Sequence, residues 1–403
     1  MDVVAGIDWA SEEHRLCLVD REGGRLLERR VSHDEEGLSG LCRLLGEHGV
    51  GRVAIERPEG LLVDRLLEAG LSVVPVHPNA LAAARARYQV GGGKSDGFDA
   101  YVLAELCRTD MHRLRVIEPD SDETKALRAL TRARGELVRA RVSLANQLRA
   151  ELERFWPGAA RVFADVDSPI GLAFCERYPS PEDARGLGEK RLQRFLARQR
   201  YSGRRTPAEL LERLHTAPRG RNGELEQEAR RTIVLRLVAG LRPLVEGIAQ
   251  LDSEIAHAVR THPDGAIFLS LFRDPKTTLT AAELVAEIGD SRARYPRSAA
   301  LEADAGMCAV AVESGKHRSA SFRRACDHRL RDAVATLADS SRHHHPWAAD
   351  VYRRARARGC DHPHAIRILG RAWLRVIWRI WQNHVPYDPG RHGGLQRLLA
   401  QGG

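Results

Sequence analysis

Four carboxylates stand where a strand or a helix is expected to begin or end. Asp8 closes the apolar run VVAGID and Glu56 closes GRVAIE, while Asp96 and Asp99 open the segment DGFDAYVLAEL. Asp96 and Asp99 are three residues apart, so a helix that begins there directs both side chains the same way. Carboxylate oxygens are the ligands that Mg²⁺ prefers. If the four converge, they predict a Mg²⁺ (or Mn²⁺) site that acts on phosphodiesters.

Each of these residues also has an ordinary structural interpretation. Acidic residues are common in the first turn of a helix, where they offset the helix dipole and satisfy free N–H groups. Asp8 alone is equally well explained as a turn residue at a strand end. Because four carboxylates cannot gather without cations, their convergence decides between the two interpretations.

The elements expected in residues 1–115 bring the four carboxylates to one edge of a sheet. Strands are predicted to end at Asp8 and near Glu56, and HRLCLVD, RLLERRVS and LSVVPVHP supply three more. Helices are expected over residues 35–48, from Pro58 through Leu61, Leu62, Leu66 and Leu67, and from Asp96 onward. The order β-β-β-α-β-α-β-α predicts an α/β domain of the ribonuclease-H-like (RuvC-type) fold.

A competing interpretation shares this beginning. GIDWASEEHRLCLVD is also typical of the first phosphate-binding strand pair of sugar kinases and actin-like ATPases, which use the same fold. Those proteins need a second Asp-Gly-Thr hairpin and a Gly-rich adenosine loop further along. The sequence contains neither, so the ATPase interpretation is not favoured.

Composition and charge indicate a cytoplasmic protein that binds a polyanion. Of 403 residues, 43% are hydrophobic and 29% are charged, as in a globular protein. No apolar run reaches the ~18 residues of a membrane span, and the N-terminus lacks a basic leader. Residues 1–115 hold 15 Lys+Arg against 19 Asp+Glu, whereas the remainder holds 48 against 35. An acidic first domain followed by a basic body fits a metal-binding module joined to a nucleic-acid-binding one.

Other residues that could bind metal are better explained otherwise. The seven cysteines contain no CxxC pair, which argues against a zinc ribbon or a disulfide framework. His343, His344 and His345 are interpreted as a solvated helix end.

Trp373, Trp378 and Trp381 lie on an apolar helical segment, where core packing is favoured over base stacking.

Residues 116–260 are expected to form a helical, coiled-coil linker. Leucines at helical spacing fill residues 120–160, and shorter helices are expected around 189–200 and 207–215. A second long helix has a 4-3-4-3-4 apolar seam of Leu237, Leu241, Leu244, Ile248, Leu251 and Ile255. Pro243 within it predicts a kink or a helix start. The two long helices form either a dimerising coiled coil or an internal helical hairpin.

A mainly helical C-terminal domain is expected over 261–390, followed by a flexible tail over 391–403. Within this domain, Ser314 is a second candidate catalytic residue. ESGKHRSASFRRACDHRLRDAV places Ser-Gly-Lys in a turn with basic residues behind it. A serine hydroxyl becomes a nucleophile when its proton is accepted and the developing charge is stabilised. The ordinary interpretation is turn chemistry before a glycine. The expected nucleic-acid contacts are Lys94, Lys316, Arg318, Arg323, Arg324 and Arg329.

Several segments together resemble the DEDD transposases of the insertion-sequence one-ten family. They include GIDWA, AIERPEG, VHPNALAAARARY, GGGKSDGFDAYVLAELCRTDMHRL, LVAEIGD, ESGKHRSASFRRACDHRLRDAV and AIRILGRAWLRVIWRIWQNHVPYDP, in the family's order over nearly the whole chain. The resemblance implies a RuvC-type domain, similar to Holliday-junction resolvases, joined to a C-terminal transposase domain. It also implies a site-specific DNA recombinase guided by an RNA made from its own element, the bridge RNA.

The resemblance also implies roles for single residues. Asp8, Glu56, Asp96 and Asp99 match the metal-binding tetrad, and Ser314 matches a serine nucleophile that forms a phosphoserine–DNA intermediate. It further implies an active site composed from two subunits of a dimer or tetramer. The expected location is the prokaryotic cytoplasm, in association with the nucleoid. The stretches Arg273–Thr278 and Ala309–Glu313 depart from the family's pattern.

Two further hypotheses remain open at this point. One is a structure-selective, metal-dependent RuvC-type nuclease that uses water as its nucleophile. The other is a domesticated, non-catalytic nucleic-acid-binding protein.

Overall fold

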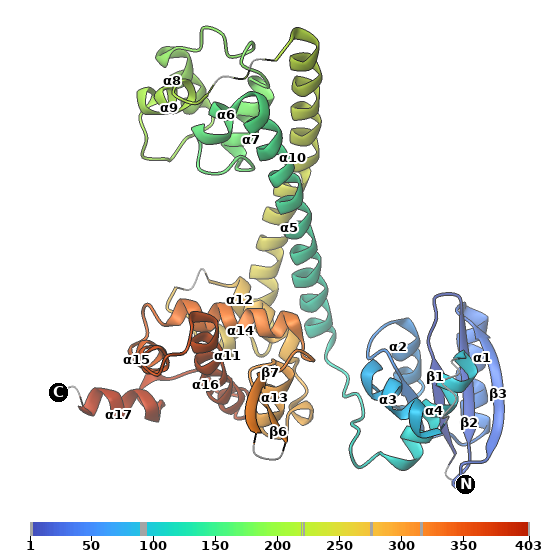
Figure 1. Ribbon diagram of the computed structural model, residues 1–403. Coiled ribbons are helices and arrows are strands. Elements are labelled where there is room, and N and C mark those ends of the chain that lie inside the picture. The colour runs from blue at the N-terminus through green and yellow to red at the C-terminus, as the bar shows by residue number, and fades with distance from the viewer. Residues whose placement is uncertain are drawn as a thin grey trace. The chain divides into compact units, whose positions relative to one another are not determined.

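Alternating and apolar runs near the N-terminus form a five-stranded sheet of the order β3-β2-β1-β4-β5 (Figure 1). Its strands are β1 (Val4–Asp8), β2 (Glu13–Val19), β3 (Arg25–Ser32), β4 (Arg52–Ile55) and β5 (Ser72–Pro75). β2 runs antiparallel to β1 and β3, whereas β4 and β5 run parallel to β1. This mixed topology confirms the predicted ribonuclease-H-like fold.

The sheet belongs to the first of two units in a computed structural model that describes residues 3–88, 95–218, 220, 222–274, 277–314 and 317–401. The first unit is Met1–Pro119 and the second is Asp120–Gly403. Among the described helices, none is both long and apolar enough to cross a membrane.

Helices cover both faces of the sheet because its central strands are apolar on both sides. These helices are α1 (Glu35–Glu47), α2 (Leu61–Glu68), α3 (Pro78–Tyr88) and α4 (Asp96–Thr109). Leu41 of α1 and Leu66 of α2 pack with Ile7 on one face. Val102 and Leu103 of α4 pack with Cys17 and Val74 on the other. α3 was not among the predicted elements.

Gly6 lets α4 lie directly against β1. A Cβ atom on Gly6 would stand 2.0 Å from the carbonyl oxygen of Ala100 and 2.3 Å from the backbone nitrogen of Ala104. Only a residue without a side chain tolerates backbone this close. Since Gly6 and Asp8 point to the same face of the sheet, this contact places the first turns of α4 beside Asp8.

Two long helices, α5 (Asp122–Phe155) and α10 (Glu224–Thr261), form the spine of the second unit. A Cβ on Gly240 would meet Leu144, and one on Gly247 would meet Leu137, so the helices are antiparallel. The predicted pair is thus an internal helical hairpin within this chain, and Pro243 lies inside a continuous helix.

The spine links two apolar cores. At one end of α5, Leu148 and Leu152 pack with α6 (Pro157–Val162), α7 (Pro169–Arg177), α8 (Glu189–Arg198) and α9 (Pro207–His215), which we call the arm tip. At the other end, Leu127 packs in the core of the C-terminal helices. We call that second body the C-terminal bundle.

The C-terminal bundle contains mostly helices and one hairpin. Its helices are α11 (Gly265–Leu269), α12 (Leu279–Ile288), α13 (Ser298–Asp304), α14 (His328–Ser341), α15 (Pro346–Ala357), α16 (His362–Gln382) and α17 (Gly393–Gln401), with 3-10 turns η1 (Arg292–Arg294) and η2 (Pro389–Arg391). The hairpin joins β6 (Ala309–Ser314) to β7 (His317–Phe322). Trp373 and Trp381 are fully buried, as the core interpretation predicted.

Two details of this bundle differ from the sequence analysis. His345 caps α15, and its Nε2 lies 2.8 Å from the Tyr387 hydroxyl in a partly buried aromatic group, so it is not simply solvated. Residues 393–401, expected in a flexible tail, form α17 with Leu395 buried.

Candidate active site

Asp8 and Glu56 leave the same edge of the sheet from neighbouring parallel strands. Ile7 of β1 is in register with Ile55 of β4, and the two acidic residues follow these partners directly. Adjacent strands lie about 4.8 Å apart, so the two carboxylates begin close together. Both residues are half-buried. The register of β1 and β4 therefore starts the two side chains from neighbouring positions.

Asp99 points into the unit and pairs with Arg85, which projects from α3. The Asp99 side chain is 3% exposed. Arg85 Nε donates to its Oδ1 at 2.5 Å, and Arg85 Nη2 donates to its Oδ2 at 2.7 Å. A two-pronged bond of this kind fixes the orientation of both groups. It also compensates a buried charge that would otherwise be unfavourable.

Arg85 supplies positive charge to three of the four predicted carboxylates. Its pKa is raised first by the hydrogen bond to Asp99, and then, against the effect of burial, by the charges of Asp99, Glu56 and Asp8. These three acidic groups therefore lie within electrostatic range of one guanidinium. The sequence analysis assigned no role to Arg85, because nothing in the spacing of the arginines of LAAARARY singles it out.

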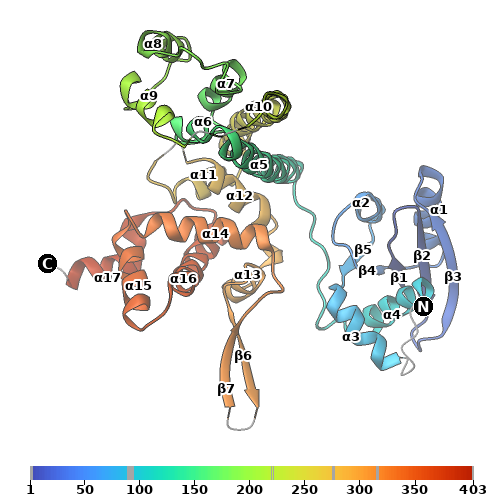
Figure 2. The ribbon, with the colours of Figure 1, turned by 45° about the horizontal axis from the view of Figure 1, so that its top comes forward.

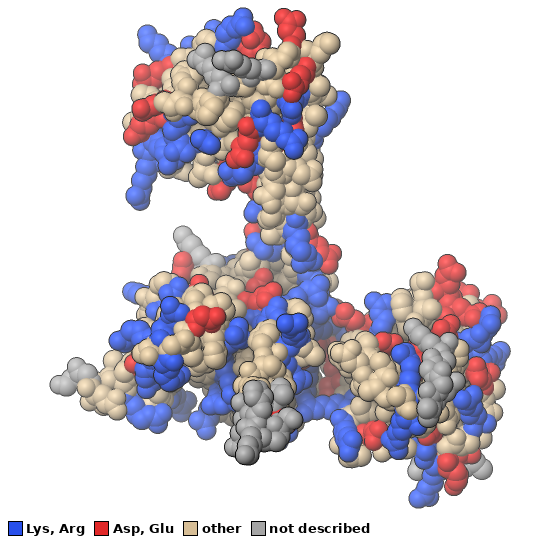
Figure 3. Space-filling model, in the orientation of Figure 1, with Lys and Arg blue, Asp and Glu red and all other residues tan. Residues whose placement is uncertain are grey.

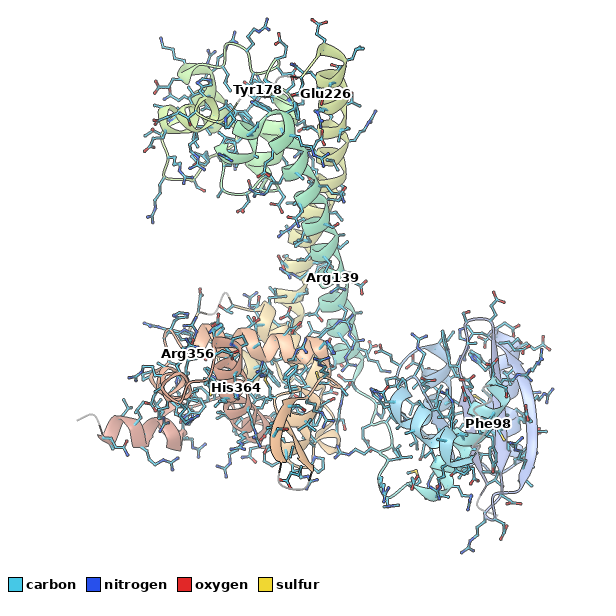
Figure 4. All side chains as sticks on the ribbon, viewed as in Figure 1. Phe98, Arg139, Tyr178, Glu226, Arg356 and His364 are labelled. Carbon is cyan, nitrogen blue, oxygen red and sulfur yellow. The ribbon has the colours of Figure 1, made fainter. Side chains whose placement is uncertain are left out.

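Asp96 is placed differently from the other three. It is exposed at the first position of α4, where Ser95 caps the helix by accepting from the Phe98 amide at 3.2 Å. Phe98, in the first turn of this helix, is labelled in Figure 4. It lines a surface pocket of about 380 Å³ together with Arg15, Arg25, Glu28, Ser95, Gly97 and Phe98. The expected capping chemistry is therefore present, but Ser95 performs it.

The donor set fits a hard divalent cation, although its members do not stand at ligating distances. Within the described residues, no three His, Cys, Asp or Glu side chains are close enough to hold one metal ion. Asp99 is turned toward Arg85, and Asp96 toward solvent. Asp99 is bonded to Arg85, and Asp8 and Glu56 lie within electrostatic range of the same guanidinium. Carboxylate oxygens are the type of ligand that Mg²⁺ and Mn²⁺ prefer.

A histidine pair lies beside Asp8, around the end of β1. The Ala10 amide donates to Nδ1 of His14 at 3.3 Å, which places the proton of neutral His14 on Nε2, 2.8 Å from His33 Nδ1. Burial, followed by the charge of His33, lowers the pKa of His14 to about 4. The guanidinium of Arg57 lies 4.0 Å from the centroid of the Trp9 ring. These contacts involve Trp9 and Ala10, the two residues that follow Asp8.

Ser314 ends β6 at the outer end of the hairpin, which extends away from the C-terminal bundle (Figure 2). The side chains of Ser314 and Arg318, and the whole of Lys94 and Lys316, lie outside the described residues. Arg324 is exposed, Arg323 donates to the Ala325 carbonyl at 3.0 Å, and Arg329 lies 3.8 Å from Glu136.

The base of the hairpin holds two further arginines that the sequence analysis did not single out as contacts. Arg367 lies 4.7 Å and Arg331 lies 5.8 Å from the ring centroid of Phe322, the last residue of β7. Phe322 is 37% exposed. Sequence spacing could not reveal this group, because Arg367 comes from α16, some 45 residues along the chain.

The sequence matches two family models. Residues 5–157 match a model described as a transposase of the DEDD type, and residues 277–353 match one described as transposase IS116/IS110/IS902 family. A mini-circle protein of Streptomyces coelicolor, described as a transposase for IS117, is 32% identical over 97% of this chain and 96% of its own length.

Other relatives show the same full-length correspondence. A 42 kDa protein of insertion element IS900 from Mycobacterium paratuberculosis is 27% identical, over 96% of this chain and 97% of its own. Among solved structures, Thermus thermophilus RuvC in complex with a Holliday junction substrate is similar with a TM-score of 0.24 and 17% identity, covering 29% of this chain and 100% of RuvC.

Proposed function

The chain belongs to the IS116/IS110/IS902 family of transposases, and we propose that it cleaves and rejoins DNA with a carboxylate-held metal site and a serine nucleophile. One observation supports the metal site above all others. Asp8, Glu56 and Asp99 come from β1, the end of β4 and α4, yet all three act on the single guanidinium of Arg85. Folding has therefore gathered acidic groups that lie far apart in the sequence.

The metal ligands in this proposal are Asp8, Glu56, Asp99 and Asp96. Mg²⁺ or Mn²⁺ held there would stabilise negative charge on a phosphodiester and polarise its oxygens. The chain's own contribution is positional: the contact at Gly6 fixes α4 against β1, and the strand register fixes Asp8 beside Glu56. Asp96, at the exposed start of α4, is proposed as the fourth ligand.

Ser314 is the proposed nucleophile. Its hydroxyl loses its proton to a base as Oγ attacks phosphorus, a phosphoserine ester forms, the bond from phosphorus to the leaving DNA oxygen breaks, and that oxygen takes up a proton; religation reverses the step. The proposal is supported by the position of residue 314 at the end of β6, and by Arg324 and Arg329, which are exposed and follow it in the chain. Lys316 and Arg318 are proposed as further phosphate contacts, and Lys94 as one beside the carboxylates.

Guidance by an element-encoded RNA and assembly as a dimer or tetramer are proposed from the family resemblance. The four carboxylates belong to the first unit and Ser314 to the second. A division of the chemistry between units of the chain is compatible with an active site shared by subunits.

The test is formation of a covalent protein–DNA adduct. The full chain is incubated with Mg²⁺, labelled DNA containing the element ends, and RNA transcribed from the element's flank, and products are resolved under denaturing conditions. A protease-sensitive adduct is expected with the wild type and is absent in Ser314→Ala and Asp8→Asn.

A second candidate is a metal-dependent nuclease that uses water. The observation that favours it is that the carboxylate cluster lies wholly within the first unit, without Ser314. Cleavage that persists in Ser314→Ala, with no adduct in the wild type, would establish this candidate and reject the serine step.

A further inference from the structure

Helix α8 and the loop after it concentrate positive charge on the arm tip. Residues 189–205, EKRLQRFLARQRYSGRR, contain seven basic residues and one acidic residue. The seven are Lys190, Arg191, Arg194, Arg198, Arg200, Arg204 and Arg205, and every one is exposed. We call this surface the α8 basic face.

The core of the arm tip fixes which way this face points. Leu192, Phe195 and Leu196 are buried among the apolar residues of α6, α7 and α9. The basic residues at positions 190, 191, 194 and 198 are therefore held on the opposite, solvent side of a helix that cannot rotate. Basic side chains project from the arm tip in Figure 3.

The α8 basic face differs from several other arginines of the second unit, which form ion pairs with carboxylates; one of its residues, Arg205, lies within electrostatic range of Glu209. Elsewhere Arg185 pairs with Glu182 at 2.6 Å and Arg231 with Asp183 at 3.1 Å. On α8, Arg191 and Arg194 donate only to the backbone carbonyls of Gly186 and Lys190. In the part of the chain that the structure describes, none of the seven forms an ion pair within 4.0 Å.

Arg200 is a second, independent sign of function. The Tyr201 amide donates to the Leu196 carbonyl at 3.0 Å and the Arg200 amide to the Ala197 carbonyl at 3.1 Å, the Schellman pattern that ends a helix. Arg200 occupies its left-handed position, with φ of 49°. Glycine is strongly preferred there, because a side chain is strained in this conformation. A charged side chain therefore occupies a position that glycine would fill without strain.

From these observations we propose that the α8 basic face, which contains none of the residues assigned to catalysis, binds the phosphate backbone of duplex DNA. Single-strand surfaces add exposed aromatic rings on which bases stack. The aromatic residues here are instead packed inward: Phe195 is buried, and the Tyr201 ring lies 5.9 Å from Phe163. A rigid helix with cations and no stacking ring fits a duplex backbone. The inference rests on the proposed function for the choice of DNA.

The test compares two variants that remove equal charge. One is Arg191→Gln/Arg194→Gln/Arg198→Gln. The control is Arg139→Gln/Arg154→Gln/Arg185→Gln, whose arginines are 66%, 67% and 80% exposed but paired with glutamates three residues earlier. Affinity of the full chain for a labelled 30-base-pair duplex, a length chosen as about three turns of DNA, is measured by anisotropy in EDTA over a range of NaCl.

The first variant is expected to bind DNA at least about tenfold more weakly at 0.1 M salt, with the slope of log affinity against log salt reduced by about 2 to 3. The control should stay close to the wild type. Arg200→Gly supplies a variant that is expected to fold, because glycine adopts the left-handed conformation without strain. It should weaken DNA binding while leaving the unfolding temperature unchanged or higher.

Three outcomes overturn the inference. The α8 variant and the control could lose the same affinity, Arg200→Gly could bind as tightly as the wild type, or only the affinity for an RNA duplex of equal length could fall. EDTA prevents cleavage, so binding is measured apart from chemistry. If the wild type forms the covalent adduct in Mg²⁺ but the α8 variant binds DNA normally, this inference fails and the proposed function stands.

Discussion

Arg85 is a basic residue at the centre of an acidic site. In the absence of a bound cation its guanidinium offsets the charge of Asp99 and, at longer range, of Asp8 and Glu56. A group that neutralises ligands also competes with any cation for them. The same residue is therefore expected to stabilise the metal-free protein and to weaken metal binding.

Arg85→Gln tests this competition. The substitution should lower the unfolding temperature in EDTA, because it leaves the buried Asp99 carboxylate unpaired, at a cost on the order of 3 kcal/mol. It should also tighten Mn²⁺ binding, measured by titration calorimetry, and enlarge the increase in unfolding temperature that Mn²⁺ causes. Arg87→Gln, at a more exposed site on the same helix, is the control. Weaker Mn²⁺ binding in Arg85→Gln would show that Arg85 supports the site and does not compete for it.

His14 makes the stability of the first unit depend on pH. The folded protein holds its pKa near 4, against 6.5 in the unfolded chain, so the unfolded state binds more protons between these values. The stabilisation is present above pH 6.5 and is lost as pH falls toward 4. Between pH 7 and pH 5 the loss is about 2 kcal/mol.

Hydrogen exchange of amides in β1 and β2 measures this loss without interference from His345, a histidine of the second unit with a similarly lowered pKa. In His14→Gln the difference between pH 7 and pH 5 should shrink. An undiminished difference would assign the effect to other groups.

At the scale of elements, the contact between α4 and β1 sets the site. Gly6→Ala would force a methyl group into the Ala100 carbonyl, so either the helix or the strand must move. We expect a loss of about 2 to 3 kcal/mol in the free energy of unfolding. Gly46→Ala, in α1 with no atom near the added carbon, should instead stabilise by about 0.5 to 1 kcal/mol. Urea denaturation measures both, and equal effects would contradict the close approach.

The sequence was sufficient to predict the strands and helices whose first or last residues have a recognisable signal. Asp8 and the residue before Glu56 close apolar strands, and the helix start at Asp96 has its capping serine and acidic first turn. α3 lacked such a signal, because small and charged residues of PNALAAARARY give no apolar stripe. Its arginine therefore went unassigned. The long-range pairing of Arg85 with Asp99 depends on how α3 and α4 pack, which no local pattern encodes.

At the scale of the whole chain, the boundary between the two units has a measurable position. The sequence placed it after residue 115, but Ile117 packs on the core of the first unit, and its amide donates to the Val73 carbonyl at 2.7 Å. A fragment of residues 1–119 should therefore unfold cooperatively and be more stable than a fragment of residues 1–115 by about 1 to 2 kcal/mol. Thermal and urea unfolding of the two fragments decides this, and equal stability would mean that Ile117 contributes nothing.

The antiparallel spine behaves as a molecular ruler. Leu127 is rooted in one core and Leu148 in another, while the stretch between them meets α10 through a repeating seam. Seven residues inserted into α5 and seven inserted opposite them in α10 would preserve that seam. They would move the core of the arm tip about 10 Å farther from the core of the C-terminal bundle. Descendants of this enzyme could thus change how far they span along a nucleic acid while keeping every catalytic group unaltered.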